Sequence, residues 1–218
     1  MFGLTTIPRN FPQVSIGDVN QSASPSNLSS YSLSGTYGAA DPRRMVLLMP
    51  VWIDSADTLT SATSSSIAHT IHGQRRQGNA NCAVTSVLLP DDTMGTDVLT
   101  FSGTISSVHM RTARLLKFRK TTAFDVKMNG AVATSVSVTI RVPPLGALYC
   151  VAASQTTPFN GWDTPIFQTE NISGYEDLNG LFGRYSNPSR QFKDIVVKAN
   201  RASSGNCALV AASFWGDN

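Results

Sequence analysis

The sequence predicts an all-β protein, and three observations lead to this prediction. Ser and Thr together make up about a fifth of the 218 residues, well above ordinary usage. Thr and Val favour strands, whereas Ser, Gly and Pro favour the turns between them. Charged residues are only 14% of the chain, which argues against a long solvated helix, a coiled coil or a charged disordered tail. The length suits one large all-β domain or two small ones.

Composition and hydropathy exclude several classes of protein. The longest apolar run, Met45–Ile53, is nine residues long and contains Pro50, so it is far shorter than the roughly 20 residues of a membrane helix. Phe2–Asn10 lacks a charged segment followed by an apolar one, so we expect no secretory signal. The net charge of +3 is too small to indicate nucleic-acid binding. No C-x-x-C motif is present, and we interpret the three cysteines as buried core residues: Cys82, Cys150 and Cys207.

The first 40 residues differ in composition from the rest. They contain three prolines, several Ser and Asn, and only Arg9 and Asp18 as charges. We interpret 1–40 as an extended arm, either a loose tail or a segment that becomes ordered against neighbouring subunits. Leu28, Tyr31 and Leu33 suggest that the arm joins a strand near its end. The remainder, 41–218, is predicted to be one β-sandwich domain.

The strands of this domain are predicted from apolar runs and from the residues that bound them. Arg44–Ile53 is expected to be buried on both faces, with Pro50 at a bulge or a sheet edge. Gly103 is expected to end the strand before it. Further strands are predicted at 66–75, 81–89, 97–102, 108–118, 131–142, 147–153, 195–199 and 207–215. Eight or more antiparallel strands predict a β-sandwich, either jelly-roll-like or immunoglobulin-like.

Ala131–Val142 has the cleanest alternation of apolar and polar residues. Its apolar phase contains Val132, Val136, Val138, Ile140 and Val142. Such a period of two is typical of a half-buried strand. The preceding Asn129-Gly130 pair favours a tight turn.

The sequence also contains a hint of internal duplication. Asn81-Cys82-Ala83-Val84 is echoed by Asn206-Cys207-Ala208-Leu209, and Met45–Val51 and Ala147–Ala153 are both predicted as buried strands. Two half-sandwich units of similar design would explain these parallels.

Residues that catalysis requires do not form a recognisable group. The chain has no G-x-S-x-G elbow and no Gly-rich phosphate loop. His69 and His72 are three residues apart, which places them on opposite faces of a predicted strand and prevents them from sharing one metal ion. Glu occurs only at Glu170 and Glu176, in a stretch where acids are expected to be solvated. We therefore expect no enzyme, no metal and no cofactor.

A basic cluster within ten residues is the main candidate for a contact with a partner. Three interpretations are open: a solvated strand edge that resists aggregation, a subunit interface that faces an acidic partner, or contact with phosphates. The net charge does not favour nucleic acid, so we take the interface as the working hypothesis. Its residues are Arg111, Arg114, Lys117, Arg119 and Lys120, with Arg75 and Arg76 added from an earlier segment.

Residues 154–192 combine a weak strand pattern with seven aromatic residues. Loop-like sequence of this kind either caps the end of a sandwich or forms a binding surface. In the second case, aromatic rings would stack on a sugar while polar neighbours hydrogen-bond it. The candidate glycan contacts are Phe159, Asn160, Trp162, Tyr175 and Tyr185.

From residue 28 onward, the order of the segments resembles a loose family of structural proteins from tailed phages, prophages and gene-transfer-agent-like particles. The most specific pieces are V-L-T-F-S-G at 98–103 and N-C-A-L-V-A-A-S-F at 206–214. The resemblance implies an all-β virion component of tail, fibre, spike or head-decoration type. Such a protein is assembled in the host cytoplasm and contacts copies of itself and other virion proteins. The alternative is a carbohydrate- or receptor-binding sandwich module that uses 154–192 to bind a host surface glycan.

Overall fold

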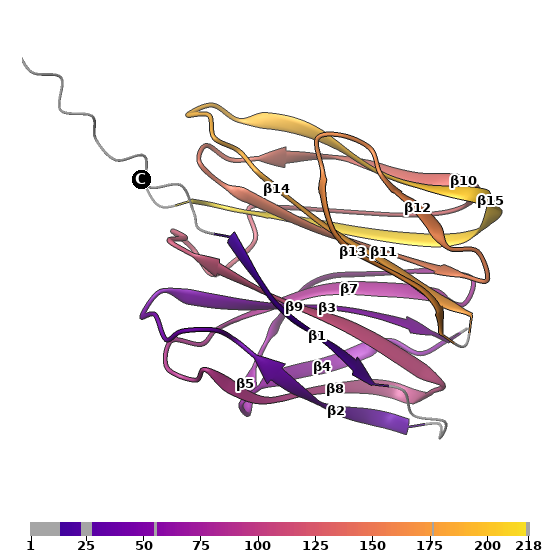
Figure 1. Ribbon diagram of the computed structural model, residues 1–218, viewed down its shortest axis with the longest axis horizontal. Helices are drawn as coiled ribbons and strands as arrows, with labels where there is room; N and C mark the ends of the chain where they lie inside the picture. The colour runs from indigo at the N-terminus through magenta and orange to yellow at the C-terminus, as the bar shows by residue number, and fades with distance from the viewer. Residues whose placement is uncertain (1–13, 23–27, 55, 176, 217–218) are drawn as a thin grey trace, which may run out of the picture.

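The computed structural model describes residues 14–22, 28–54, 56–175 and 177–216, which form antiparallel strands in several sheets (Figure 1). This confirms the prediction of an all-β protein. In the described part of the chain, no helix is long and apolar enough to cross a membrane. The strands are β1 (Val14–Ser22), β2 (Leu28–Thr36), β3 (Arg44–Ile53), β4 (Leu59–Ser64), β5 (Ile67–Ala68), β6 (Thr70–Gln77), β7 (Ala80–Leu88), β8 (Met94–Ile105), β9 (Ser107–Leu116), β10 (Asp125–Val142), β11 (Ala147–Gln155), β12 (Phe159–Trp162), β13 (Phe167–Tyr175), β14 (Leu178–Ser186) and β15 (Lys193–Phe214).

The strands form three stacked sheets. Sheet I has the order β2-β8-β4-β5, sheet II the order β1-β9-β3-β7-β6, and sheet III the order β10-β15-β11-β14-β13, with β12 added beside β15. Sheet II lies between the other two (Figure 1). Sheets I and II, from β1 to β9, make up the N-terminal half of the fold. Sheet III, from β10 to β15, makes up the C-terminal half.

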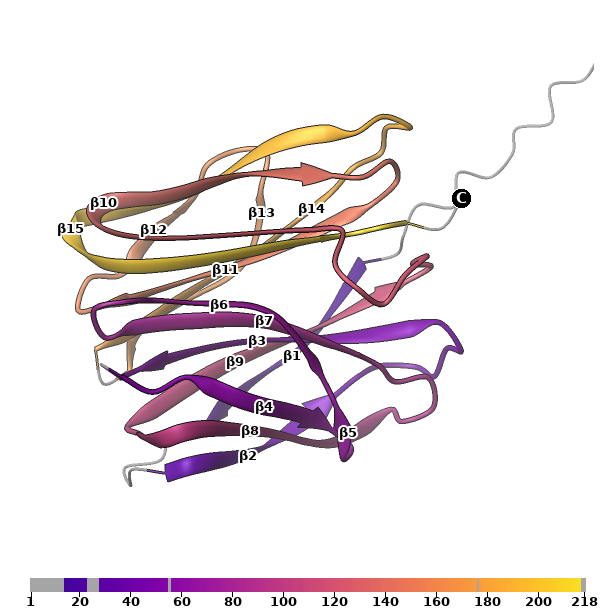
Figure 2. The same ribbon diagram turned by 180° about the vertical axis from the view of Figure 1, so that it is seen from behind.

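Sheet III folds back over itself through the long strands β10 and β15. Their pairing shifts register between Ala133 and Ser135, where β15 passes through 201–204. On one side of this bulge, β15 pairs with β11. On the other side, β12 joins β15, and the β10–β15 pair forms an additional layer (Figure 2).

Each gap between layers contains its own hydrophobic core. The first core lies between sheets II and III and includes Met45, Tyr149 and Phe182. The second lies between sheets I and II and includes Leu48 and Leu99. The third lies under the folded-back part of sheet III. Sheet II and the inner part of sheet III are therefore covered on both faces, which explains why β3, β7, β11 and the end of β15 are buried along nearly their whole length.

The two halves share one strand order. In the N-terminal half the pairs are nested: β1 with β9, β2 with β8, β3 with β7, and β4 with β5. In the C-terminal half, the start of β10 pairs with the end of β15, the rest of β10 with the start of β15, and β11 with β14. β13 forms a hairpin with β14 as β6 does with β7. Met45–Val51 and Ala147–Ala153 thus occupy equivalent positions in β3 and β11, whereas the two Asn-Cys-Ala segments, in β7 and β15, do not.

Several predicted strand boundaries were wrong. Asn129-Gly130 is not a turn, because it lies inside β10 and pairs with Leu209 and Ala208. Gly103 does not end a strand but lies within β8. Pro50 lies inside β3, which has β9 on one side and β7 on the other, and only the ladder with β7 is interrupted, between Leu48 and Val51. The segments predicted at 195–199 and 207–215 are one strand, because the bulge lets β15 pass between layers without ending.

The aromatic stretch 154–192 is not a loop but contains β12, β13 and β14. Glycines weaken its apolar pattern because the layers need space there. A Cβ atom on Gly180 would lie 3.0 Å from Val51 of sheet II, and one on Gly183 would lie 2.6 Å from Trp162 Nε1. Glycine in a strand allows this close approach but leaves a poor strand signal in the sequence.

The predicted alternation in β10 holds for only part of the strand. Val136, Ile140 and Val142 are buried in the third core, but Val132 is 65% exposed. The bulge near Thr134 adds a residue to the strand, so Val132 shares its face with Val126, which packs against the first core. A β-bulge reverses which phase of a strand is buried.

The expected arm, 1–40, lies partly outside the described residues. Within it, β1 pairs with β9 of sheet II and β2 pairs with β8 of sheet I. The cysteines are free and buried, as predicted.

Candidate subunit interface

The structure separates the residues of the predicted basic cluster. Arg111 and Arg114 are half-buried on β9. Arg119 and Lys120 are exposed in the segment that connects the two halves. Arg75 and Arg76 are exposed on β6, at the opposite edge of sheet II from β1, with β3 and β7 between them and β9. Lys117, half-buried, follows β9. These basic residues are therefore close together in the sequence but do not form a single surface patch.

An aromatic group that the sequence does not reveal lies beside Arg119. The rings of Phe124, Phe192 and Trp215 contact one another with centroid distances of 5.0 to 5.7 Å. The Arg119 guanidinium lies 6.0 Å from the Trp215 ring centroid, and that of Arg141 lies 4.9 Å from the Phe192 centroid. We call these five residues the end cluster. Their wide separation along the chain explains why sequence reasoning missed the group.

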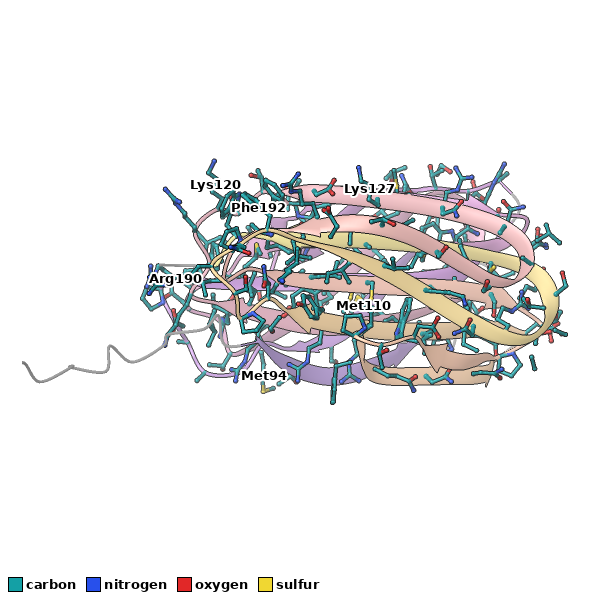
Figure 3. The ribbon with its side chains drawn as sticks, turned by 90° about the horizontal axis from the view of Figure 1, so that it is seen from above. Met94, Met110, Lys120, Lys127, Arg190 and Phe192 are labelled. Carbon is teal, nitrogen blue, oxygen red and sulfur yellow. The ribbon has the colours of Figure 1, made fainter. Side chains whose placement is uncertain are left out.

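Positive charge surrounds the end cluster. Lys120 and Arg190 lie at the same end of the molecule as Phe192 (Figure 3), and Phe192 is 41% exposed. Two acidic residues lie beside the cluster. Asp194 is paired with Arg141 across β10 and β15, and Asp125 accepts a hydrogen bond from the Arg141 backbone N–H at 3.0 Å and forms a 3.3 Å ion pair with Lys127. Aromatic residues and arginine are enriched where proteins bind one another. The end cluster therefore has the composition of an interface for an acidic partner.

The candidate glycan contacts are divided between the core and the surface. Phe159 is 3% exposed, and Trp162 and Tyr185 pack against the third core. Asn160 is exposed, and the side chain of Tyr175 lies outside the described residues. In the same region, Phe167 is 61% exposed, with the Arg184 guanidinium 5.2 Å from its ring centroid.

A chain of buried polar side chains crosses the second core. Tyr37 Oη donates to Asp97 Oδ1 at 2.7 Å, and Ser64 Oγ donates to the same oxygen at 2.5 Å. Ser64 Oγ lies 2.8 Å from His69 Nε2, and His69 Nδ1 lies 2.9 Å from Thr85 Oγ1. Because Ser64 gives its one proton to Asp97, His69 Nε2 must donate to Ser64, which leaves Nδ1 of the neutral imidazole as the acceptor that faces Thr85 Oγ1.

This chain differs from a catalytic triad in its order. In a triad the carboxylate contacts histidine, whereas Asp97 contacts Ser64, and Ser64 is fully buried. Burial raises the pKa of the Asp97 carboxyl. Burial, with a smaller effect of His72, lowers the pKa of His69 to about 3. The sequence did contain a signal for this site, because Asp97 shares its phase with the inward-facing Leu99 and Phe101.

The described residues give little support for metal or thiol chemistry. Across the described ranges, no three His, Cys, Asp or Glu side chains come close enough to hold a metal ion. Burial raises the pKa of the thiols of Cys82, Cys150 and Cys207, which keeps them protonated and unreactive. Comparison of the chain with known protein families, curated proteins and solved structures found no match.

Proposed function

We propose that this protein is a structural subunit of a phage-like particle, built from two jelly rolls. The observation that carries the proposal is the nested strand order that occurs in both halves. A jelly roll is a long antiparallel ribbon rolled up so that successive strands alternate between two sheets. Eight-stranded jelly rolls recur in viral capsid and lectin domains.

The strand order favours a jelly roll over an immunoglobulin-like sandwich. In an immunoglobulin domain the first two strands are neighbours in one sheet. Here β1 belongs to sheet II and β2 to sheet I, and the chain returns to sheet II at β3 and to sheet I at β4. In this proposal the region expected to be one sandwich domain, 41–218, is divided between two units that share the first core.

The surfaces of the two units fit a protein that acts by packing against neighbours. The end cluster offers three aromatic rings, two stacked arginines and surrounding positive charge. We assign it as the contact with another, acidic, virion protein in a tail, fibre, spike or head-decoration position. Charge complementarity of this kind sets the orientation and the rate of association.

The proposal is tested by mass spectrometry of density-purified particles from the organism that carries the gene. The expected result is that the chain is present at a fixed ratio to the major capsid protein. On the order of hundreds of copies would indicate a decoration protein, and about three to twelve a tail or spike subunit. Absence from the particles would overturn the proposal and favour the glycan-binding alternative.

The role of the end cluster is tested with paired variants in the same particles. Phe192→Glu places a negative charge among the cluster's aromatic rings and should remove the chain from purified particles. Val196→Glu is the control, because Val196 lies four residues after Phe192, on β15, and is 53% exposed but lies outside the cluster. Equal incorporation of both variants would contradict the assignment of this surface.

A further inference from the structure

β2 forms an open edge of sheet I. It pairs with β8 on one side and has no strand on the other among the described residues. From Ser30 to Thr36 its pairing with β8 is regular, because the register shift of this ladder lies nearer the start, between Leu28 and Ser30. The strand sequence, L-S-S-Y-S-L-S-G-T, contains no charge and no proline. An edge of this kind is a template for pairing with another strand.

The other open edges of the described sheets carry features that oppose strand pairing. β6 has Arg75 and Arg76 and a register shift. β10 has Lys127 and Arg141 and a bulge. β1 and β13 also contain register shifts, and β5 is only two residues long. Charges, bulges and short strands are the usual means by which proteins protect sheet edges. Of the edges described, β2 is the exception.

The backbone of β2 presents alternate residues to this open side. The Tyr37 N–H donates to Thr93 O at 2.9 Å, one position beyond the Thr36–Met94 pair. Hydrogen-bonded pairs alternate in an antiparallel ladder, so Tyr31, Leu33 and Gly35 bond to β8. The N–H and C=O groups of Ser32 and Ser34 therefore point away from β8, toward the open edge.

The side chains beside this edge are small and uncharged. Ser30, Ser32 and Ser34 are exposed on the outer face of sheet I. Their neighbours on β8 are Thr100, Val98 and Thr96, respectively, and the next strand contributes Ser61 and Thr63. None of these paired residues is charged, and hydroxyl pairs across strands are mildly favourable.

We propose that β2 pairs antiparallel with β2 of a second copy of this chain across a two-fold axis, which joins two four-stranded sheets into one. A second copy fits because antiparallel pairing of identical edges gives each open donor an acceptor, as in any isologous contact. With Leu33 at the axis, Ser32 of each copy lies opposite Ser34 of the other. The inference does not depend on a role in particles.

The purified full chain tests the proposal by its mass in analytical ultracentrifugation. The expected wild-type species at about 100 µM, well above micromolar affinity, has twice the 23.3 kDa of the chain. Ser34→Pro removes an N–H that points to the open edge, and Ser32→Lys places like charges near the axis. Each should raise the dissociation constant more than about tenfold. Thr100→Lys is the control, because it changes the same face one strand away from the edge and should leave the dimer intact.

Amide hydrogen exchange gives an independent reading of the same contact. In the dimer, the amides of Ser32 and Ser34 should be protected, and dilution to the monomer should release them. The amides of Leu33 and Gly35 should stay protected in both states because they bond to β8. A monomeric wild type at 100 µM, a dimer unaffected by both β2 variants, or a dimer dissociated by Thr100→Lys alone would overturn the proposal.

Discussion

The two halves of the molecule share a strand order but differ in their outer surfaces. The outer face of sheet I is formed by hydroxyl side chains, Val98 and the 72% exposed Met94, without charge along β2 and β8. The outer layer of the C-terminal half pairs Ser137 with Lys198 and Arg141 with Asp194 across β10 and β15. The inward residues of both halves are apolar because stacking requires it. The outward residues are free to differ, so one half has a charged, solvated face and the other a neutral face suited to contact with protein.

The ends of both halves are closed by the same kind of contact. Buried Arg44 donates to the carbonyl oxygens of Leu89, Gly38, Ala39 and Asp92. In the C-terminal half, Asn187 Nδ2 at the corresponding end donates to Pro143 O and Gln191 O, among others. Side-chain donors thus satisfy loop carbonyls that no strand reaches. The N-terminal half uses a charged donor for this purpose and the C-terminal half a neutral one.

The largest expected effect tests whether the two halves unfold together. Phe182 is fully buried in the first core, which sheets II and III share. Phe182→Ala should lower the free energy of unfolding by about 3–5 kcal/mol through the lost contacts and the cavity. Because both halves use this core, we expect a single transition in calorimetry and in urea unfolding.

Leu99→Ala is the matched variant, because Leu99 is fully buried in the second core, within the N-terminal half. It should cost about 2–5 kcal/mol and also leave one transition. Two separate transitions, of which Leu99→Ala shifts only one, would show that the halves are independent domains.

The next largest effect concerns the two end contacts. Arg44→Met should cost about 3 kcal/mol, because several loop carbonyls lose a charged donor. Asn187→Leu removes neutral hydrogen bonds and should cost about 1–2 kcal/mol. Chemical denaturation of both variants measures the difference. An equal or larger cost for Asn187→Leu would contradict the view that the N-terminal half depends more on its charged contact.

The sequence predicted the all-β class and most buried strands, because strands covered on both faces are continuous apolar runs. The prediction failed where contacts between layers, which are distant in the sequence, determine the structure. The bulge near Thr134 lies where β10 and β15 pass from one layer to the next. A regular alternation of apolar and polar residues does not reveal such a bulge. Gly180 and Gly183 are strand residues because of what packs against them, namely Val51 and Trp162.

The candidate site was predictable only in part. Arg119 was identified from the basic run, but its aromatic partners were not. Phe124 and Trp215 lie next to each other because β10 begins where β15 ends, with Asp125 paired to Ser213. The local sequence of neither segment reveals this pairing. The sequence shows that β2 has no charged residue, but only the structure shows that β2 lies at the edge of a sheet.

The contribution of histidine to acid sensitivity should originate in the N-terminal half, because all three histidines, His69, His72 and His109, lie there. Burial lowers the pKa of His69 to about 3 and that of His72 to about 4. Below a pH of about 6.5, a histidine of the unfolded chain binds a proton, whereas the buried histidine of the folded protein stays neutral. The free energy of unfolding therefore falls as the pH drops from about 6.5 toward 4. The slope is up to about 1.4 kcal/mol per pH unit for each histidine.

The raised pKa of Asp97 acts in the opposite direction, since the folded protein binds that proton more tightly. Urea unfolding at pH 7, 6 and 5 measures the net slope. His72→Gln replaces the imidazole with an amide that can still hydrogen-bond Ser86, whose Oγ lies 2.6 Å from His72 Nε2. It should reduce the slope by up to about 1.4 kcal/mol per pH unit, because one titrating histidine is removed. An unchanged slope in this variant would mean that His72 titrates normally in the folded protein.

The smallest expected effect is on the charged outer face of the C-terminal half. Lys198 forms a 3.3 Å ion pair with Asp163, but both side chains are substantially exposed, at 39% and 48%. Water and salt screen such a pair, so Lys198→Ala should change the free energy of unfolding by less than about 0.5 kcal/mol. Asp163 keeps the amide of Asn200, 2.6 Å away, as a donor. Urea unfolding at low and high salt measures the effect. A loss of more than about 1 kcal/mol would mean that these charges stabilise the outer layer and are not merely solvated. The outer face of the C-terminal half would then serve stability, whereas the neutral outer face of sheet I would serve contact with protein.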